Sequence, residues 1–369
     1  MRQRLAFAGL VALVVFYLAA SPSAAARDAD FTHLWAAGAA WLEGAAYNPV
    51  LQKELLFGAV EEPLWAARND ALGTFFYPPS ALFLYGPLGA MPVHTAGLVM
   101  AVLNAALGVL AGVLIARVTG RSPMAGVAVV LLYPSFFFAY VLGQNGPLTL
   151  CLLVGALVAS ERSRPVLAGV LLGLMAWKPS WLFAVSWLWL VLPQRGRVLA
   201  GFVAGAAGLT LASLALGGGS EFLELAPRIA TLSEQGDYPA HLQYNLQRFG
   251  PLGWVAAAGL VGVTLWKGRG NAPAALVAAT LVNPHMHHYD ALPALVAVAA
   301  LGRWWVVVPF HLAFVASEAL GIGAWVPLPV LAMLAVWAFS LFGGPAPRPA
   351  PGGRSASQPA SPRAPDPVG

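Results

Sequence analysis

Charge is the scarcest property of this 369-residue chain, since only 9% of its residues are charged whereas 59% are hydrophobic. Soluble globular domains carry about 25% charged residues, and the mean hydropathy of +0.72 departs from them in the same direction. Cysteine is almost absent. The single cysteine, Cys151, lies inside an apolar run. The composition therefore excludes a soluble globular fold, and one cysteine cannot form a disulfide framework or a cysteine-based metal site within the chain. What remains is a polytopic membrane protein.

Apolar runs predict the fold class: an all-α membrane helical bundle with about twelve (10–13) transmembrane helices. The candidate runs fall at about 5–26, 93–117, 123–141, 147–160, 165–177, 179–192, 198–216, 252–266, 272–283, 291–302, 304–320 and 325–342. Several are too short for a straight span, which predicts tilted, short or broken helices. The apolar stretch 77–92 contains four prolines, so we interpret it as a re-entrant or interfacial segment.

We expect one polytopic membrane domain over residues 1–342, with outer loops at about 27–92 and 217–250. Residues 343–369 are rich in Pro, Ala, Gly and Ser, a composition that predicts a disordered cytoplasmic tail. The basic start and the small residues before Arg27 also fit a signal peptide, so cleavage of residues 1–26 stays open.

Basic residues are scarce in every second loop, which predicts the orientation of the bundle. One set of loops carries eleven before the tail: Arg2, Arg4, Arg117, Arg121, Arg162, Arg164, Arg195, Arg197, Lys267, Arg269 and Arg303. The other, longer set carries six: Arg27, Lys53, Arg68, Lys178, Arg228 and Arg248. The positive-inside rule places both termini in the cytoplasm of a bacterial-type cell membrane. The net charge of +5 is therefore a topology signal, and no nucleic-acid partner is expected.

The unusual polar clusters all fall on the predicted outer face. They are the segment around Asp28 and Asp30, GQNG (143–146), WKPS (177–180), the loop 217–250 with Asn245, and NPHMHHYD (283–290). Clusters so far apart in the chain are not expected to share one side by chance. They predict an outward-facing polar site.

Each cluster has a functional and a plainer interpretation. Asp30 is a candidate base at the water boundary, or it only solvates a helix end, as we expect of Asp28. Lys178 neutralises a phosphate, or its ammonium extends to the lipid headgroups. His285 and His287 are candidate hydrogen-bond donors to a phosphate, while zinc binding with Asp290 is a weaker alternative because no further ligands accompany them. We otherwise expect no cofactor.

The ordered motifs resemble those of glycosyltransferase family 87, the DUF2029 group of GT-C-fold enzymes, which includes polyprenyl-phosphate-mannose-dependent mannosyltransferases. The matching residues are Asp30 with Phe31, Gly44 to Tyr47 with Pro49, Tyr77 to Pro79, Gly143 to Asn145, an A-G-x-L-x-G-L pattern before Lys178 and Pro179, and Pro284 to Asp290. The resemblance covers about residues 28–300. NPHMHHYD stands where the actinobacterial mannosyltransferases commonly have a different motif, so mannose and any one acceptor stay open.

The resemblance implies a transferase that takes a sugar from a lipid carrier, with Asp30 as the general base. Donor binding falls to Lys178, His285, His287, Gln144, Asn145 and Tyr77, and acceptor or supporting roles fall to Asp28, Glu43, Tyr47, Asn245, Tyr289 and Asp290. The expected partners are a polyprenyl-phosphate sugar, a glycolipid, glycan or protein acceptor, and membrane lipid. A transporter or flippase of lipid-linked sugars, or a non-catalytic assembly protein, are the alternatives.

Overall fold

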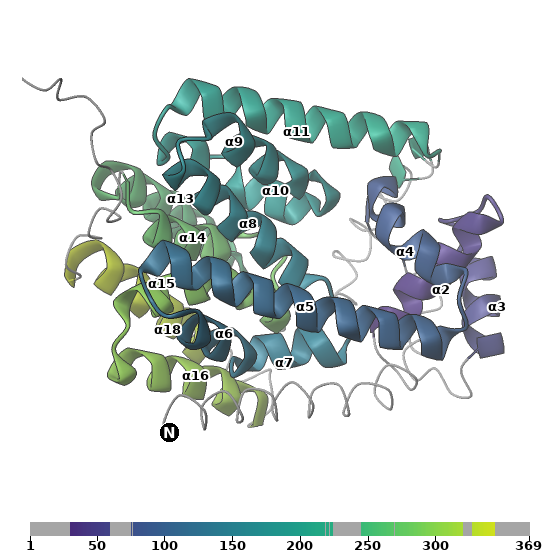
Figure 1. Cartoon of the computed structure of the whole chain (residues 1–369), viewed down its shortest axis with the longest axis horizontal. Coiled ribbons are helices and arrows are strands. Elements are labelled where there is room, and N and C mark those ends of the chain that lie inside the picture. Colours follow the sequence, from purple (N-terminus) through teal and green to yellow (C-terminus); the bar gives the residue numbers. More distant parts are fainter. Residues whose placement is uncertain are drawn as a thin grey trace, which may run out of the picture.

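The computed structural model describes residues 30–59, 75, 77–217, 219–220, 222–223, 245–268, 270–319 and 327–343. Within these ranges all regular structure is helical, which confirms the all-α fold class (Figure 1). The predicted first span, Asp28, the tail from residue 344 and parts of both predicted outer loops lie outside the described residues.

The α-helices run in the order α2 (Asp30–Leu42), α3 (Pro49–Ala59), α4 (Leu82–Gly89), α5 (Val93–Thr119), α6 (Pro123–Leu131), α7 (Pro134–Val141), α8 (Gly146–Glu161), α9 (Pro165–Gly173), α10 (Pro179–Val185), α11 (Arg195–Ala215), α13 (Gly250–Lys267), α14 (Ala272–Val282), α15 (Leu295–Leu301), α16 (Trp304–Ala319) and α18 (Pro327–Ala338). The 3-10 segments are η1 (Pro79–Ala81), η2 (Leu174–Trp177), η3 (Leu188–Leu190), η5 (Gln247–Phe249) and η6 (His288–Ala294), and η7 (Phe339–Gly343) is π-helical.

Every predicted apolar run within the described residues forms helix, yet few of these helices are long. Among the described residues, only α5, with 27 residues, and α11, with 21, are long and apolar enough to cross a membrane alone, and the bent pair α6 and α7 would make a third span. Six shorter apolar helices accompany them. The expected count of about twelve spans is therefore not confirmed for the described part of the chain, whereas short and broken helices are what the run lengths predicted.

Proline sets many of these helix starts. It occupies one of the first two positions of α6, α7, α8, α9, α10, α13 and α14, where its missing N–H costs no intrahelical hydrogen bond. The break before Pro134 bends α6 against α7 by 64°. A second break, at Lys178 and Pro179, separates η2 from α10 and leaves Lys178 with a non-helical backbone (φ −132°, ψ 89°). The stretch 77–92 forms η1 and the eight-residue α4, too short to span.

Helices α9 and α11 pack through glycines spaced four residues apart. A Cβ on Gly169 or Gly173 would overlap the backbone of α11, and a Cβ on Gly201 or Gly205 would overlap the backbone of α9. Small residues at this spacing let two helix backbones approach closely in a membrane. Because α9 leads through η2 into Lys178, this contact also fixes the position of the lysine.

We expect Gly201→Leu to destabilise the protein by about 1–3 kcal/mol, because the new side chain has no space against Val166 and Val170 of α9. Gly208→Leu is the matched control in the same helix, since a Cβ on Gly208 would have nothing within 4 Å. Thermal unfolding of the purified variants in one detergent checks the prediction. Equal unfolding temperatures for the two leucine variants would show that the glycine contact contributes little.

The two ends of the bundle differ in chemistry. At one end, the basic residues lie in or beside the last turns of α5, α8 and α13 and the first turns of α6, α9, α11 and α14. Two hydrogen bonds are made at this end: Arg121 donates to the Ala300 carbonyl at 3.4 Å, and the Gly270 N–H donates to the Val191 carbonyl at 3.3 Å. At the other end, α2, α3 and α4 group beside the start of α5 and the end of α11 (Figure 1). The polar motifs lie toward this second end.

Candidate functional site

A buried ion pair lies at the centre of the site. Lys178 Nζ is 2.5 Å from Asp290 Oδ1, although the two residues are 112 positions apart in the chain. Lys178 is 5% exposed and Asp290 2% exposed. Two charges so deeply buried are tolerated only because they neutralise each other, and removing one partner leaves an uncompensated charge. Neither of the two interpretations of Lys178 from the sequence, a phosphate ligand or a lysine extending to the headgroups, included this partner.

The histidine motif wraps around the same carboxylate. Asp290 Oδ2 accepts a hydrogen bond from the His287 N–H at 3.4 Å, so the Asp290 side chain caps the start of η6. The Asp290 N–H donates to the His287 carbonyl at 2.9 Å, a backbone bond of the 3-10 type. The His287 ring lies between those of His285, at 4.8 Å, and Tyr289, at 5.3 Å. The Lys178 ammonium lies 5.8 Å from the centre of the Tyr289 ring.

Burial lowers the pKa of His285 to about 4, and the Lys178 charge acts in the same direction while Asp290 opposes it. His285 is therefore neutral at neutral pH. It can donate or accept a hydrogen bond there, but it does not supply a positive charge. A phosphate bound beside His285 would therefore take its positive counter-charge from Lys178.

The GQNG loop joins α7 to α8 directly against the histidine motif. A Cβ on Gly146 would lie 2.8 Å from the Tyr289 carbonyl oxygen. The Asn145 amide donates to the Tyr85 hydroxyl at 2.9 Å, and the Asn104 amide donates to the Gln144 carbonyl at 3.0 Å. Both asparagines are fully buried. The loop is therefore hydrogen-bonded to the phenol of Tyr85 in α4 and to the side-chain amide of Asn104 in α5.

The backbone of Asp30 lies beside the GQNG loop because its neighbour Phe31 contacts that loop. The Phe31 N–H donates to the Leu142 carbonyl at 3.0 Å, and a Cβ on Gly143, which has a φ of +63°, would overlap the Phe31 side chain. These two contacts dock the start of α2 on the GQNG loop. Asp30 is the first residue of α2, and its side chain lies outside the described part of the structure, as does the whole of Asp28.

Aromatic side chains connect the YPP motif to Lys178. The Tyr77 ring stacks on Trp177 with 5.9 Å between ring centres and an angle of 11°. The Tyr47 hydroxyl donates to the Tyr77 carbonyl at 2.6 Å, and Tyr85 lies 6.3 Å from Tyr77. Tyr47 and Tyr77 thus belong to the same cluster as Asn145 and Lys178.

Of the remaining candidates, Asn245 joins this assembly and Glu43 does not. The Asn245 amide donates to the Asn283 carbonyl at 2.8 Å, where α14 turns into the histidine motif. Glu43 follows the last residue of α2, a 13-residue helix that begins at Asp30, and it is exposed. The two acidic residues are therefore about 20 Å apart along the helix axis, and a shared role is not expected.

The structure also adds four residues that were not among the candidates, of which Trp177 and Asn283 lie within the motifs and Tyr85 and Asn104 lie outside them. Tyr85, Asn104, Trp177 and Asn283 contact or border the candidate residues, and the Asn283 side-chain nitrogen and the Trp177 indole nitrogen have no hydrogen-bond partner among the described residues. Asn104 was the easiest of these to find, because an amide in the middle of a long apolar helix is costly unless it is used.

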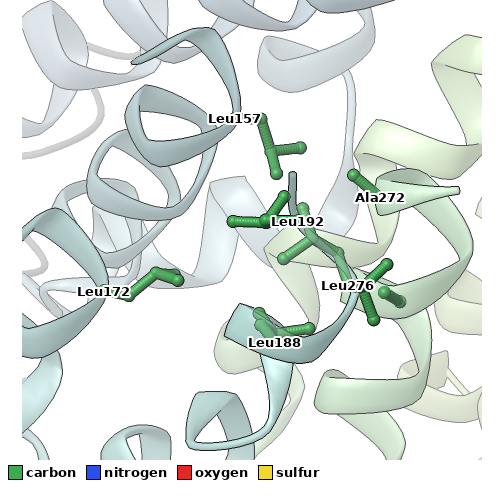
Figure 2. A pocket seen from close by; sticks show the side chains of 8 residues that line it. Leu157, Leu172, Leu188, Leu192, Ala272 and Leu276 are labelled. Atoms are coloured by element: carbon green, nitrogen blue, oxygen red, sulfur yellow. The ribbon is translucent and has the colours of Figure 1, made fainter. Parts of the chain in front are cut away.

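Two other kinds of site find no support in the described residues. No group of three or more His, Cys, Asp or Glu side chains in the described ranges is arranged to hold a metal ion, so His285, His287 and Asp290 do not form such a group. Figure 2 shows a small cavity between α8, α9, η3 and α14 that is lined by Leu157, Leu172, Leu188, Val191, Leu192, Ala272, Ala275 and Leu276. An aliphatic lining offers no group for catalysis.

Helices long and apolar enough to cross a membrane, together with a buried polar cluster at helix ends within the described residues, are features of integral-membrane enzymes and carriers. The sequence profile of glycosyltransferase family 87 matches residues 75–286, which is more than half of the chain. The chain belongs to glycosyltransferase family 87 and is a membrane glycosyltransferase. No curated protein and no solved structure matches it. The matched range includes Tyr77, Gln144, Asn145, Lys178 and His285, and it ends before Asp290.

Proposed function

We propose that the protein transfers a hexose from a polyprenyl-phosphate donor to an acceptor hydroxyl on the outer face of the membrane, with inversion at the anomeric carbon. Mannose is one candidate sugar. The observation that carries this proposal is the convergence of Lys178, the GQNG loop, the histidine motif and the start of α2 on one end of the bundle.

The chemistry needs few groups. In the proposed reaction the acceptor oxygen bonds to the anomeric carbon, the bond from that carbon to the phosphate oxygen breaks, and the acceptor proton passes to the Asp30 carboxylate. Polyprenyl phosphate leaves with the electron pair. A phosphate leaving group needs charge stabilisation and no acid, so one base and one cation suffice. Direct displacement assisted by one carboxylate inverts the anomeric centre.

Each remaining candidate has a part in this proposal. Lys178 faces the donor phosphate, and His285, which is neutral, and His287 donate hydrogen bonds to its oxygens. Gln144, Asn145 and Tyr77 bind the lipid-linked sugar. Tyr47, Asn245, Tyr289 and Asp290 support these groups through the contacts described above. Glu43 is exposed beyond the last residue of α2 and takes no part in the proposed reaction. Asp28 lies outside the described residues.

Incubation of purified protein with a radiolabelled polyprenyl-phosphate sugar tests the proposal. We expect the label to appear in a new glycoside and unlabelled polyprenyl phosphate to accumulate, both resolved by thin-layer chromatography. The flippase alternative makes a different prediction, because a flippase moves the intact donor between leaflets without cleaving it. An intact donor after incubation with a panel of glycolipid and glycan acceptors, together with its movement across liposomes, would favour that alternative.

The proposed orientation predicts which helix ends face outward. In a variant whose buried Cys151 is replaced by alanine, a cysteine at the exposed Val50 of α3 should react with an impermeant maleimide in intact cells. A cysteine at Gly196, exposed at the basic end of the bundle, should react only after permeabilisation. The reverse pattern would place the polar cluster on the cytoplasmic side.

A further inference from the structure

The ammonium of Lys178 already has an anionic partner, and this limits how it can receive a phosphate. The ion pair with Asp290 is direct, at 2.5 Å, and both side chains are more than nine-tenths buried. A phosphate oxygen that bonded Lys178 while Asp290 kept its place would lie close to a carboxylate. Like charges at such a separation disfavour each other by a factor of about 10–1,000 in an equilibrium.

We propose that Asp290 is a positioning residue that holds the place of the donor phosphate: its carboxylate pairs with Lys178 before the lipid binds, and a phosphate oxygen takes over that contact when it does. This inference rests on the proposed function, because it takes Lys178 as the phosphate ligand. In this role the Asp290 carboxylate competes with the donor phosphate for Lys178, which differs from the supporting role expected from the motif.

The contacts of Asp290 suit such an exchange. Only Oδ1 faces Lys178, while Oδ2 accepts from the His287 N–H and the Asp290 backbone N–H donates to the His287 carbonyl. Losing Lys178 therefore leaves the carboxylate with a hydrogen bond and leaves the start of η6 capped. His285 is neutral beside the pair, so it neither replaces the lysine charge nor competes with Lys178 for the carboxylate as a second cation.

The pair also places the lysine within the site before lipid binds. Its 2.5 Å contact with Asp290 holds Lys178 Nζ at a fixed point of the buried cluster. The carboxylate therefore keeps the lysine where a phosphate can reach it. The consequence is a weaker affinity for phosphate than a free lysine would give, combined with a site that is already assembled.

The test compares binding of undecaprenyl monophosphate to Asp290→Asn and to the wild-type protein, with undecaprenol as the uncharged control lipid. The asparagine keeps the shape and still accepts from Lys178, but it no longer competes with an anion. We expect Asp290→Asn to bind the phosphate lipid at least about tenfold more tightly. Asp290→Glu retains the charge and should bind it no more tightly than the wild type, and undecaprenol should not distinguish the three proteins.

Two further results separate this inference from the proposed function. If Asp290→Asn binds the phosphate lipid no more tightly than the wild type while Lys178→Met loses binding, Asp290 does not hold the place of the phosphate, and the donor site at Lys178 stands. If Lys178→Met binds as the wild type does, both are wrong.

A wild-type measurement decides the matter if Asp290→Asn does not fold. In the structure of the wild-type protein with undecaprenyl monophosphate, a phosphate oxygen should bond Lys178 Nζ, and Asp290 Oδ1 should lie beyond hydrogen-bond distance. An intact Lys178–Asp290 contact in that complex overturns the inference.

Discussion

Replacing Asp30 with asparagine should reduce sugar transfer by about 10²–10⁴-fold, the range typical for the loss of a general base. The change keeps the size of the side chain and removes its basicity, so folding should be unaffected. The start of α2 is fixed by the Phe31 N–H to Leu142 carbonyl hydrogen bond and by the fully buried Phe31 ring, and neither depends on the Asp30 carboxylate.

The measurement is the initial rate of transfer at saturating donor, together with donor binding. Binding should stay near the wild-type value, because the base acts on the acceptor. Two matched variants serve as controls: Asp28→Asn should have a mild effect, and Glu43→Gln should have almost none because Glu43 is exposed and lies beyond the opposite end of α2. A near-normal rate for Asp30→Asn would rule out this base and would leave Asp290 as the next carboxylate to examine.

Lys178→Met should lower transfer by about 10–1,000-fold, since a charge-assisted contact to a leaving phosphate contributes about 1.5–3 kcal/mol or more. The ion pair adds a second effect that the sequence did not predict. Methionine leaves the buried Asp290 carboxylate without a counter-charge, so we also expect the free energy of unfolding to fall by about 3–5 kcal/mol.

The double variant Lys178→Met/Asp290→Leu separates the two effects. Replacing a buried ion pair by apolar residues of similar size is often close to neutral for stability. The double variant should therefore unfold near the wild-type temperature and still transfer sugar poorly. If transfer recovers along with stability, the lysine acts only through the fold.

The polar motifs could be located from the sequence because each sits at a helix end. The apolar run that begins at Pro147 directly follows the GQNG cluster, and the run that begins at Pro179 starts within the WKPS cluster, so these breaks and clusters both appear in the sequence. The break at Pro134 was not predicted, because residues 123–141 read as one apolar run. Alternation of basic and polar loops then assigned the clusters to one side. Their contacts, such as Gly146 against the Tyr289 backbone, agree with that assignment.

The pairing of Lys178 with Asp290 could not be predicted in the same way. Run lengths and loop charges place each residue at a helix end, but they do not say which helix ends are neighbours. The same holds for Asn145 with Tyr85, which are 60 positions apart. The number of membrane spans could not be predicted for a different reason. Apolar runs show where helices form, but the breaks within the runs decide how many of these helices are long enough to cross the membrane.

The distance in sequence between the two charges also bears on how the protein is made. Lys178 leaves the ribosome 112 residues before Asp290. An unpaired lysine is expensive inside a bilayer, so during synthesis α10 should remain near the water boundary until η6 has been inserted. The ion pair is therefore a late step of assembly, and a truncation between α13 and η6 should leave a chain whose first helices insert while Lys178 stays accessible to water.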